Sequence, residues 1–390
     1  MKIIGLLSSF CLITVMLISS GALAASESND PSISETYDGT YLVKLNSVTT
    51  TASNGVIEKL GGRLKKISES GDIVVAELSG SSLYELKNSP DIQYIEPDYE
   101  VKTEIEAEKT ESVTETIPYG IQNIHAIEAQ QDGYTGKGVK IAVLDSGYSQ
   151  HSDLKVKSGY SFITNSNNYA DDFGHGTHVA GIIAASINGE GVVGVAPMAE
   201  IYAIKVLDQG GRGSYFTLIE GIDWSIKHKM DIINISFGGE NPSQILEEKI
   251  QEAYDAGILI IAAAGNDGYM GDDTILYPAR YSTAIAVGAI DSNNERAFFS
   301  AKGPALDLVA PGVKVLSTLP NNQYGMKSGT SMAAPHVTGV AALILDKNKK
   351  LSPNEVVDIL ESTAKPLGVI SEYGHGIVQA KEAVDQTACQ

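Results

Sequence analysis

Cysteine is nearly absent from this chain of 390 residues. Cys11 lies in the apolar N-terminal run, and Cys389 is the last residue but one. A framework of internal disulfides, which holds together many small exported domains, is therefore excluded. A chain of this length can be stable through burial of its core, and bound metal ions are another means of fixing loops.

Basic side chains are also scarce. Lys and Arg number 28 against 48 Asp and Glu, so that the formal net charge at pH 7 is -20. Because an acidic surface repels phosphate, this balance argues against nucleic acid as a partner.

Long hydrophobic runs are missing after the N-terminus. The run over residues 3–18 follows Lys2 and precedes the tripeptide ALA at residues 22–24. A basic start, an apolar centre and a small-residue end are typical of a secretory signal peptide, which we assign to residues 1–24. A membrane anchor is the alternative, but the run is short for a bilayer span. We expect the remaining chain to be secreted and extracellular, without a membrane partner.

Two regions of different character follow the signal peptide. Residues 37–101 have the pattern of a small α+β domain. Its expected strands are 41–45, 73–78 and 92–95, and its expected helices are 55–64 and 81–88. Residues 102–116 are charged, mostly acidic and poor in apolar side chains, which predicts an exposed linker.

Strands and helices alternate in residues 117–390, which we expect to form one large domain. The apolar runs that predict strands are 139–144, 201–207, 232–235 and 258–264. The amphipathic stretches that predict helices are 175–186, 217–229, 243–256, 331–345 and 353–363. Near-continuous apolar strands that alternate with helices indicate a parallel sheet covered on both faces, which is an α/β fold.

Polar residues follow two of these strands, where an open α/β sheet carries its functional groups. Asp145 comes directly after the first strand, and Asn266 follows the fourth. In isolation such residues are more often caps or turns. Between them the stretch HGTHVAGI places His175 and His178 at a helix start, where a zinc site competes with a catalytic role. The absence of nearby cysteine and of an HExxH pattern favours one proton-carrying histidine and one packed histidine.

Ser331 stands at a helix start in the stretch GTSMAAPHVTG. A serine at such a position is usually a cap. Together with Asp145, His175 and Asn266, however, it supplies the nucleophile, base, orienting carboxylate and oxyanion donor that nucleophilic serine catalysis requires. The order Asp, His, Ser and the lack of a G-x-S-x-G elbow exclude the α/β-hydrolase arrangement.

The stretches around these residues resemble those of the subtilisin-type serine proteases, the subtilase family. The matching motifs are AVLDSG, HGTHVAG, VGVAPMAEIYAIKVL, NISFGG, AAAGNDG, LVAPG and GTSMAAPHVTG. Residues 37–101, with their ending YIEPD, resemble the inhibitory propeptide of the family. The resemblance implies a subtilisin-like three-layer α/β fold with a mostly parallel central sheet, preceded by a small α+β propeptide domain.

The same resemblance implies roles for the polar residues. Ser331 would be the nucleophile, His175 the general base and then acid, Asp145 the carboxylate that orients the imidazole, and Asn266 a donor to the oxyanion. A broad-specificity cleft with room for a large apolar P1 residue, the one whose carbonyl is attacked, would be lined by Gly211, Arg212, Gly213, Ser236, Phe237, Gly238, Gly239, Ala263 and Gly265. Asp267 would extend tolerance to basic P1 residues.

A structural Ca²⁺ ion is also implied by the resemblance, and no organic cofactor. The loop ASINGEGVVG at residues 185–194 would bind it, and a loop without metal is the alternative. The expected ligands are Glu115, Asp153, Ser186, Asn188, Glu190 and Val192.

The resulting expectation is a secreted endopeptidase made as a zymogen, acting on protein and peptide substrates as a monomer. Its propeptide would be an intramolecular inhibitor, removed by self-cleavage between about Thr103 and Thr116. Two alternatives stay open. In the first, the chain is a catalytically silent binding or structural protein on the same fold. In the second, residues 37–101 form an inhibitor of other proteases.

Overall fold

The computed structural model describes residues 39–46, 50–59, 61–103, 108–110 and 114–388. The expected signal peptide and Cys389 lie outside the described residues. Among the described residues, no helix is both long and apolar enough to cross a membrane.

Residues 39–97 form an antiparallel sheet with two helices. The strand order is β2-β3-β1-β4. The strands are β1 (Gly39–Leu45), β2 (Arg63–Ile67), β3 (Ile73–Leu78) and β4 (Ile92–Pro97), and the helices are α1 (Thr50–Lys59) and α2 (Gly80–Lys87). Alternate strand residues such as Val43 and Val74 are fully buried with Ile57 and Leu86 in a core of this region's own. The expected α+β character is confirmed.

The expected helix over residues 55–64 is wrong at its C-terminal end. Gly61 takes a left-handed conformation with φ 78°, and the amide of Gly62 bonds to the carbonyl of Ile57. A glycine in this conformation is a common helix end, and Leu64 lies in strand β2 instead.

A seven-stranded sheet forms the centre of the large domain, and all its strand pairs are parallel. Its order is β14-β13-β12-β11-β7-β9-β8. The strands are β7 (Lys140–Asp145), β8 (Val156–Ser161), β9 (Glu200–Lys205), β11 (Ile232–Ile235), β12 (Leu259–Ala263), β13 (Ala284–Ile290) and β14 (Leu308–Pro311). The expected α/β class is confirmed. Sequence analysis predicted four of these seven strands. It missed β8, whose residues VKSGYS lack an apolar pattern, and it also missed β13 and β14.

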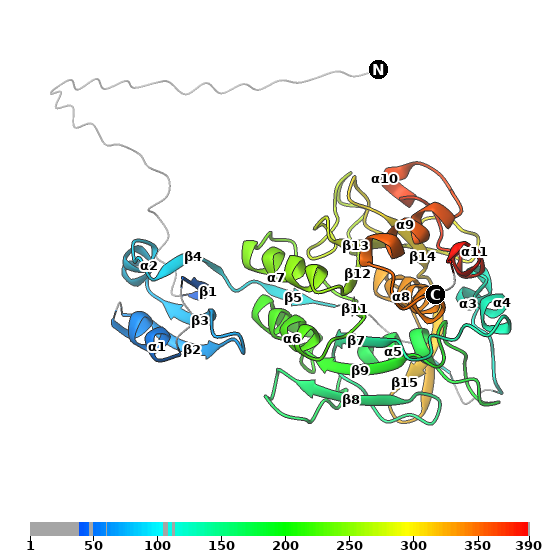
Figure 1. Cartoon of the computed structure of the whole chain (residues 1–390), viewed down its shortest axis with the longest axis horizontal. Coiled ribbons are helices and arrows are strands. Elements are labelled where there is room, and N and C mark those ends of the chain that lie inside the picture. The colour runs from blue at the N-terminus through cyan, green and yellow to red at the C-terminus, as the bar shows by residue number, and fades with distance from the viewer. Residues whose placement is uncertain (1–38, 47–49, 60, 104–107, 111–113, 389–390) are drawn as a thin grey trace, which may run out of the picture. The chain divides into compact units, whose positions relative to one another are not determined.

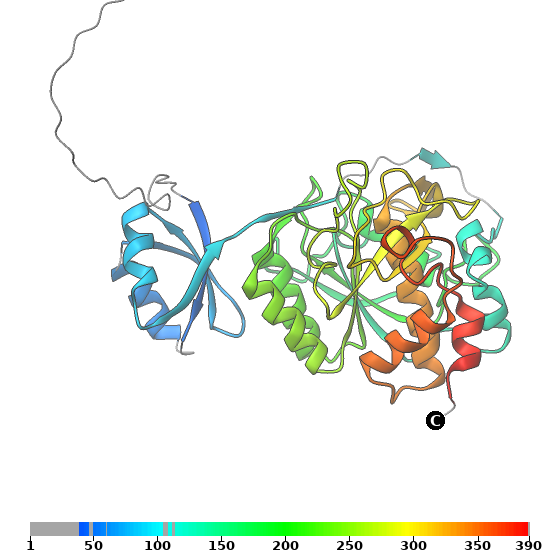
Figure 2. The ribbon, with the colours of Figure 1, turned by 90° about the horizontal axis from the view of Figure 1, so that it is seen from above.

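Helices cover both faces of this sheet (Figures 1 and 2). One face packs against α5 (His175–Ala184) and α8 (Thr330–Lys347), and the other against α6 (Tyr215–Lys227) and α7 (Gln244–Asp255). The helix α9 (Pro353–Thr363) begins with the capping box of Ser352 and Glu355, as its Ser-Pro start predicts. Shorter helices are α3 (Tyr119–Asn123), α4 (Ala126–Gln131), α10 (Ile370–Tyr373) and α11 (Ala380–Gln386).

The linker region pairs with the large domain at two places. Strand β5 (Glu100–Lys102) is antiparallel to β10 (Arg212–Ser214). Strand β6 (Glu108–Thr110) is antiparallel to β16 (Gln323–Lys327), which also pairs with β15 (Val315–Leu319). The expectation of an exposed linker therefore fails at Thr103, which is buried.

Candidate active site

Four polar side chains meet at one edge of the parallel sheet because of where their elements begin and end. Asp145 is the last residue of β7, and Asn266 follows β12. His175 is the first residue of α5, and Ser331 is the second residue of α8. The carboxyl ends of parallel strands share one edge, so that residues far apart in the chain are brought together.

Asp145 and His175 form a buried pair. The Nδ1 of His175 donates to Oδ1 of Asp145 at 2.7 Å, and neither side chain is exposed. The same carboxylate oxygen accepts from the amide of Ser146 at 2.7 Å. With the proton held on Nδ1, the ring presents Nε2 as a proton acceptor, which is the tautomer a general base needs.

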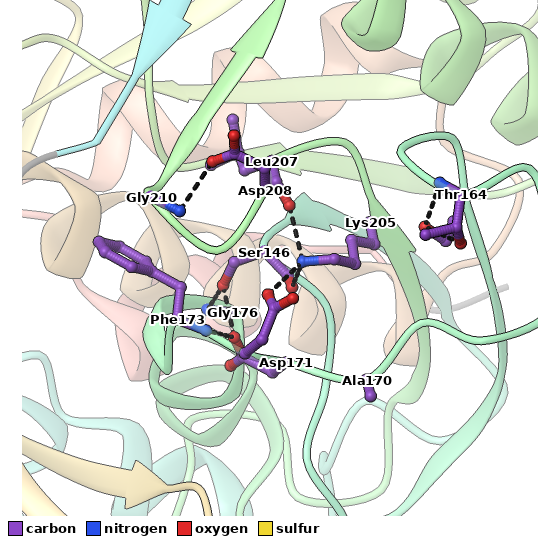
Figure 3. Close-up of polar contacts among 12 residues, drawn as sticks. Ser146, Thr164, Ala170, Asp171, Phe173, Gly176, Lys205, Leu207, Asp208 and Gly210 are labelled. Carbon is purple, nitrogen blue, oxygen red and sulfur yellow. Dashed lines mark hydrogen bonds and ion pairs between the residues drawn. The ribbon is translucent and has the colours of Figure 1, made fainter.

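A polar network holds the end of β7 against the start of α5 (Figure 3). The carboxylate of Asp171 accepts from the hydroxyl of Ser146 at 2.8 Å and from the amides of Gly174 and Thr177 at 2.7 and 2.9 Å. The buried ammonium of Lys205 donates to the carbonyl of Ser146 at 2.7 Å. Backbone on both sides of the Asp145–His175 pair is thereby fixed.

Asn266 is oriented by the residue that precedes Ser331. The amide and the hydroxyl of Thr330 donate to Oδ1 of Asn266 at 3.0 and 3.2 Å. Since the oxygen is engaged, the Nδ2 group of Asn266 is the side available as a donor toward the cleft. Sequence analysis did not single out Thr330, although the GTS motif contains it.

Thr103 of the chain's own linker contacts the ring of His175. The Nε2 of His175 lies 3.1 Å from Oγ1 of Thr103, while Oγ of Ser331 donates to the carbonyl of Ser236 at 2.6 Å. The hydroxyl of Ser331 and the ring of His175 thus have separate partners in this chain.

Comparison with known proteins shows to which family the chain belongs. The model of the subtilase family matches residues 136–376. Subtilisin E of Bacillus subtilis (strain 168) is 43% identical over 383 residues, which cover 97% of this chain and 98% of that protein. The M-protease of Shouchella clausii (strain KSM-K16) is 45% identical over 311 residues, 80% of this chain and 79% of its own length. The chain belongs to the subtilase family. It is a subtilisin-type serine endopeptidase.

The second histidine of this subtilase has a packing role. His178 is fully buried, and its Nε2 lies 3.1 and 3.0 Å from the carbonyls of Val315 and Gly325. Burial lowers its pKa well below the usual value, so the ring is neutral. Its Nε2 is therefore not free to bind a metal, and among the described residues no three His, Cys, Asp or Glu side chains are grouped so that they could hold one.

The subtilase cleft contains a cavity of about 300 Å³ beside Ser331. Five of the predicted substrate-binding residues line it, namely Phe237, Gly238, Gly239, Ala263 and Gly265. Leu276 lines it as well and was not predicted. A Cβ atom on Gly265 would lie 2.7 Å from Leu276 Cγ, so this leucine packs closely against the glycine and narrows the pocket.

The other predicted substrate-binding residues lie along two backbone segments at the edges of the cleft. Gly211 accepts the amide of Thr103 at 3.0 Å, and Gly238 accepts the amide of Lys102 at 3.2 Å. Arg212 pairs with Lys102 in the strand register and reaches the carboxylate of Glu100 at 3.4 Å. An extended segment therefore lies between the two edges, as a peptide substrate would.

The predicted calcium residues gather around the loop at 185–194. Oε1 of Glu115 accepts from the amides of Asn188 and Gly189, both at 2.7 Å. Asp153 accepts from Nδ2 of Asn188 at 3.0 Å and from the amide of Val192 at 2.8 Å. The amide of Ser186 donates to the carbonyl of Asp153 at 2.8 Å. Glu190 lies opposite Thr114 in an isolated antiparallel bridge.

Proposed function

We propose that this chain is the zymogen of a secreted, broad-specificity endopeptidase in which Ser331 attacks the peptide carbonyl. The observation that carries the proposal is the buried Asp145–His175 pair, because His175 contacts Thr103, which lines the same cavity as Ser331 and Asn266. Hydrolysis of casein by the purified chain, compared with a Ser331→Ala variant, tests it.

Each of the four residues has a defined role in the proposed reaction. Nε2 of His175 takes the proton of Ser331 as its Oγ attacks, and Asp145 stabilises the imidazolium. The oxyanion is bound by Nδ2 of Asn266 and by the amide of Ser331. His175 then protonates the leaving amine, and water hydrolyses the acyl-enzyme by the same route in reverse.

Asn266→Ala tests the proposed oxyanion donor. Because the donor acts mainly in the transition state, we expect kcat to fall about 10²- to 10³-fold with KM little changed; this size was measured in subtilisin itself, a relative. Steady-state kinetics on a chromogenic peptide provide the measurement. A rise in KM at unchanged kcat would instead assign Asn266 to ground-state binding.

Substrate selection follows from the cleft. Backbone pairing along Gly211–Gly213 and Ser236–Gly239 is indifferent to side chains, which supports broad specificity. Ala263 and Leu276 favour an apolar P1 residue, and Leu276 limits its size. Asp267 lies in the same pocket and supports tolerance of a basic P1 residue.

The region 37–101 is proposed as the propeptide that inhibits the enzyme. Oδ1 of Asp98 accepts the amide of Phe216 at the start of α6 at 3.0 Å. The carboxylate of Glu96 accepts the amides of Gln244 and Ile245 at the start of α7 at 3.0 and 3.2 Å. Carboxylates at helix N-termini are stabilising, because they satisfy free amides and meet the positive end of the helix dipole. This supports an own-chain inhibitor over a module directed at unrelated proteases.

A structural calcium ion fits the residues around the loop at 185–194. The donors are carboxylate, amide and carbonyl oxygens, which calcium prefers. Asp153 is buried, and desolvation raises its pKa to about 6, so that a cation beside it would relieve the cost of burying its charge. The six predicted residues Glu115, Asp153, Ser186, Asn188, Glu190 and Val192 would hold the ion and fix this loop.

Calcium should stabilise the uncut precursor, because Glu115 already contacts the loop in the full chain. In the Ser331→Ala precursor we expect calcium at about 1,000 times its Kd to add about 4 kcal/mol and to raise Tm by about 8 °C or more. Differential scanning calorimetry with calcium and with EDTA measures this. Asp153→Asn should abolish most of the shift, whereas the exposed control Glu128→Gln should retain it. Equal shifts in both variants would exclude this loop as the site.

A further inference from the structure

Lys327 is a buried cation close to the Asp145–His175 pair. It is the last residue of β16, shortly before Ser331 in the chain, and it is 4% exposed. Its Nζ lies 6.0 Å from the centre of the Phe173 ring, and that ring lies 6.4 Å, centre to centre, from the ring of His175. One aromatic ring therefore separates the ammonium from the proposed base, although the proposed reaction does not use Lys327.

Lys327 differs from the other buried lysines in its partners. Lysine is rarely buried unless its ammonium is paired. Lys205 donates to one carboxylate and to two carbonyls, and Lys249 donates to two carboxylates. In the part of the chain that the structure describes, Nζ of Lys327 has neither a hydrogen bond nor an ion pair. Its ammonium is thus a buried donor group without an acceptor.

The surroundings of Lys327 favour an anionic ligand. The Phe173 ring lies at the outer limit of a cation–π contact and is a weak partner. Burial lowers the pKa of Lys327, and the charges of Asp171 and Asp145 oppose this effect only in part. A carboxylate at hydrogen-bond distance would stabilise the charged ammonium and supply the missing acceptor.

Strand β16, which Lys327 ends, lies where the chain continues beyond His175. Thr103 contacts the ring of His175. Strand β6 begins a few residues later and is antiparallel to β16, with residue 108 opposite Met326. An extended polypeptide that has passed the proposed base therefore pairs with β16 through its backbone. We call this part of the cleft, which faces the residues after the cleaved bond, the leaving side.

We propose that Lys327 selects substrates that carry an aspartate or a glutamate shortly after the cleaved bond. This inference rests on the proposed function and adds a preference on the leaving side. The cavity on the other side of the bond differs in charge, because Glu240 and Asp267 line it. The substrate is thus an extended acidic segment, which pairs with β16 through its backbone and with the ammonium through a carboxylate.

The chain's own sequence contains a segment of this chemistry. After Thr103 the linker continues as EIEAE, with glutamate at positions 104, 106 and 108. This is a feature of the sequence alone, since residues 104–107 lie outside the described residues. Because the net charge of the protein is -20, most of its surface repels an acidic segment, so that a single buried ammonium can decide where such a segment binds.

Turnover of matched peptides by the mature enzyme tests the preference. One series of fluorogenic peptides has glutamate in turn at each of the first four positions after the cleaved bond, and the other has glutamine there. Mass spectrometry verifies the bond that is cut. At one position or more we expect kcat/KM to be about 10-fold higher with glutamate, the gain when a charge-assisted hydrogen bond replaces a neutral one. The ratio should fall as salt is added, because salt screens the two charges.

Variants assign this ratio to Lys327. In Lys327→Met and in Lys327→Gln the preference for glutamate should disappear, and in Lys327→Arg, which keeps the charge, it should remain. Lys137→Met is the matched control, because it removes an exposed cation that precedes β7, at the opposite edge of the sheet. It should keep the wild-type ratio. The ratio is taken within each variant, so that a change in overall turnover does not affect it.

The outcomes separate this inference from the proposed function. A wild type without a preference for glutamate at any of the four positions would overturn the inference and would assign Lys327 a packing role against Phe173. A preference that survives in both neutral variants would also overturn it. Hydrolysis of the glutamine peptides leaves the peptidase function intact in either case. A preparation that hydrolyses no peptide of either series would contradict the proposed function itself.

Discussion

Ser331→Ala is expected to abolish both maturation and turnover. Without the hydroxyl no acyl-enzyme forms, and the propeptide remains attached in the cleft where Thr103 contacts His175. For the mature enzyme the loss in kcat should be about 10⁶-fold, the size measured when the nucleophile of subtilisin, a relative, is removed. Binding of the propeptide should be unchanged, because its backbone contacts with Gly211 and Gly238 do not involve the hydroxyl.

The measurement combines intact mass with peptide turnover and with labelling by a serine-directed phosphonate. Ser282→Ala, at an exposed position after Tyr281, is the matched control and should mature, turn over and be labelled as the wild type is. Addition of mature wild-type enzyme to the Ser331→Ala precursor should release its propeptide in trans, which shows that the variant is folded and cleavable. Unaided maturation of Ser331→Ala would assign the cut to another protease.

The catalytic elements were predictable because strand ends and motifs are local features of the sequence. Asp145 ends a near-continuous apolar strand, and His175 and Ser331 each lie in the first turn of a helix, within a glycine-flanked motif. The parallel sheet then brings them together without further information from the sequence. The expected strands at 232–235 and 258–264 agree with β11 and β12 within a residue at each end for the same reason.

Other parts of the cleft depend on contacts that no local pattern reveals. Leu276 narrows the pocket through its packing against Gly265, and its loop shows no periodicity. The sequence around Thr103 predicts a charged linker, yet Thr103 is buried. The preceding residue, Lys102, pairs with β10 on one side and forms a bridge with Gly238 on the other. In the sequence Asp171 resembles an ordinary acidic loop residue. Its carboxylate, however, accepts the amide of Gly174 and so fixes the turn before His175.

Asp145→Asn is expected to reduce kcat by about 10⁴-fold, close to the loss found for removal of the corresponding carboxylate of subtilisin, a relative. The carboxylate accepts from Nδ1 of His175 and from the amide of Ser146 at one buried oxygen. An asparagine that turned its NH₂ group to the ring would require Nδ1 to accept, which moves the proton to Nε2. The imidazole could then no longer take the proton of Ser331.

This loss should fall on kcat and leave KM nearly unchanged, because the side chain of Asp145 is fully buried and its hydrogen bonds go to His175 and Ser146, not to the backbone that pairs with residues 102 and 103. Unfolding followed by circular dichroism should show a folded variant. The exposed control Asp255→Asn on α7 should retain full activity. Loss of the correct tautomer lowers kcat, whereas a uniform loss of substrate binding raises KM. A rise in KM together with the fall in kcat would therefore indicate that Asp145 supports the cleft as well as the imidazole.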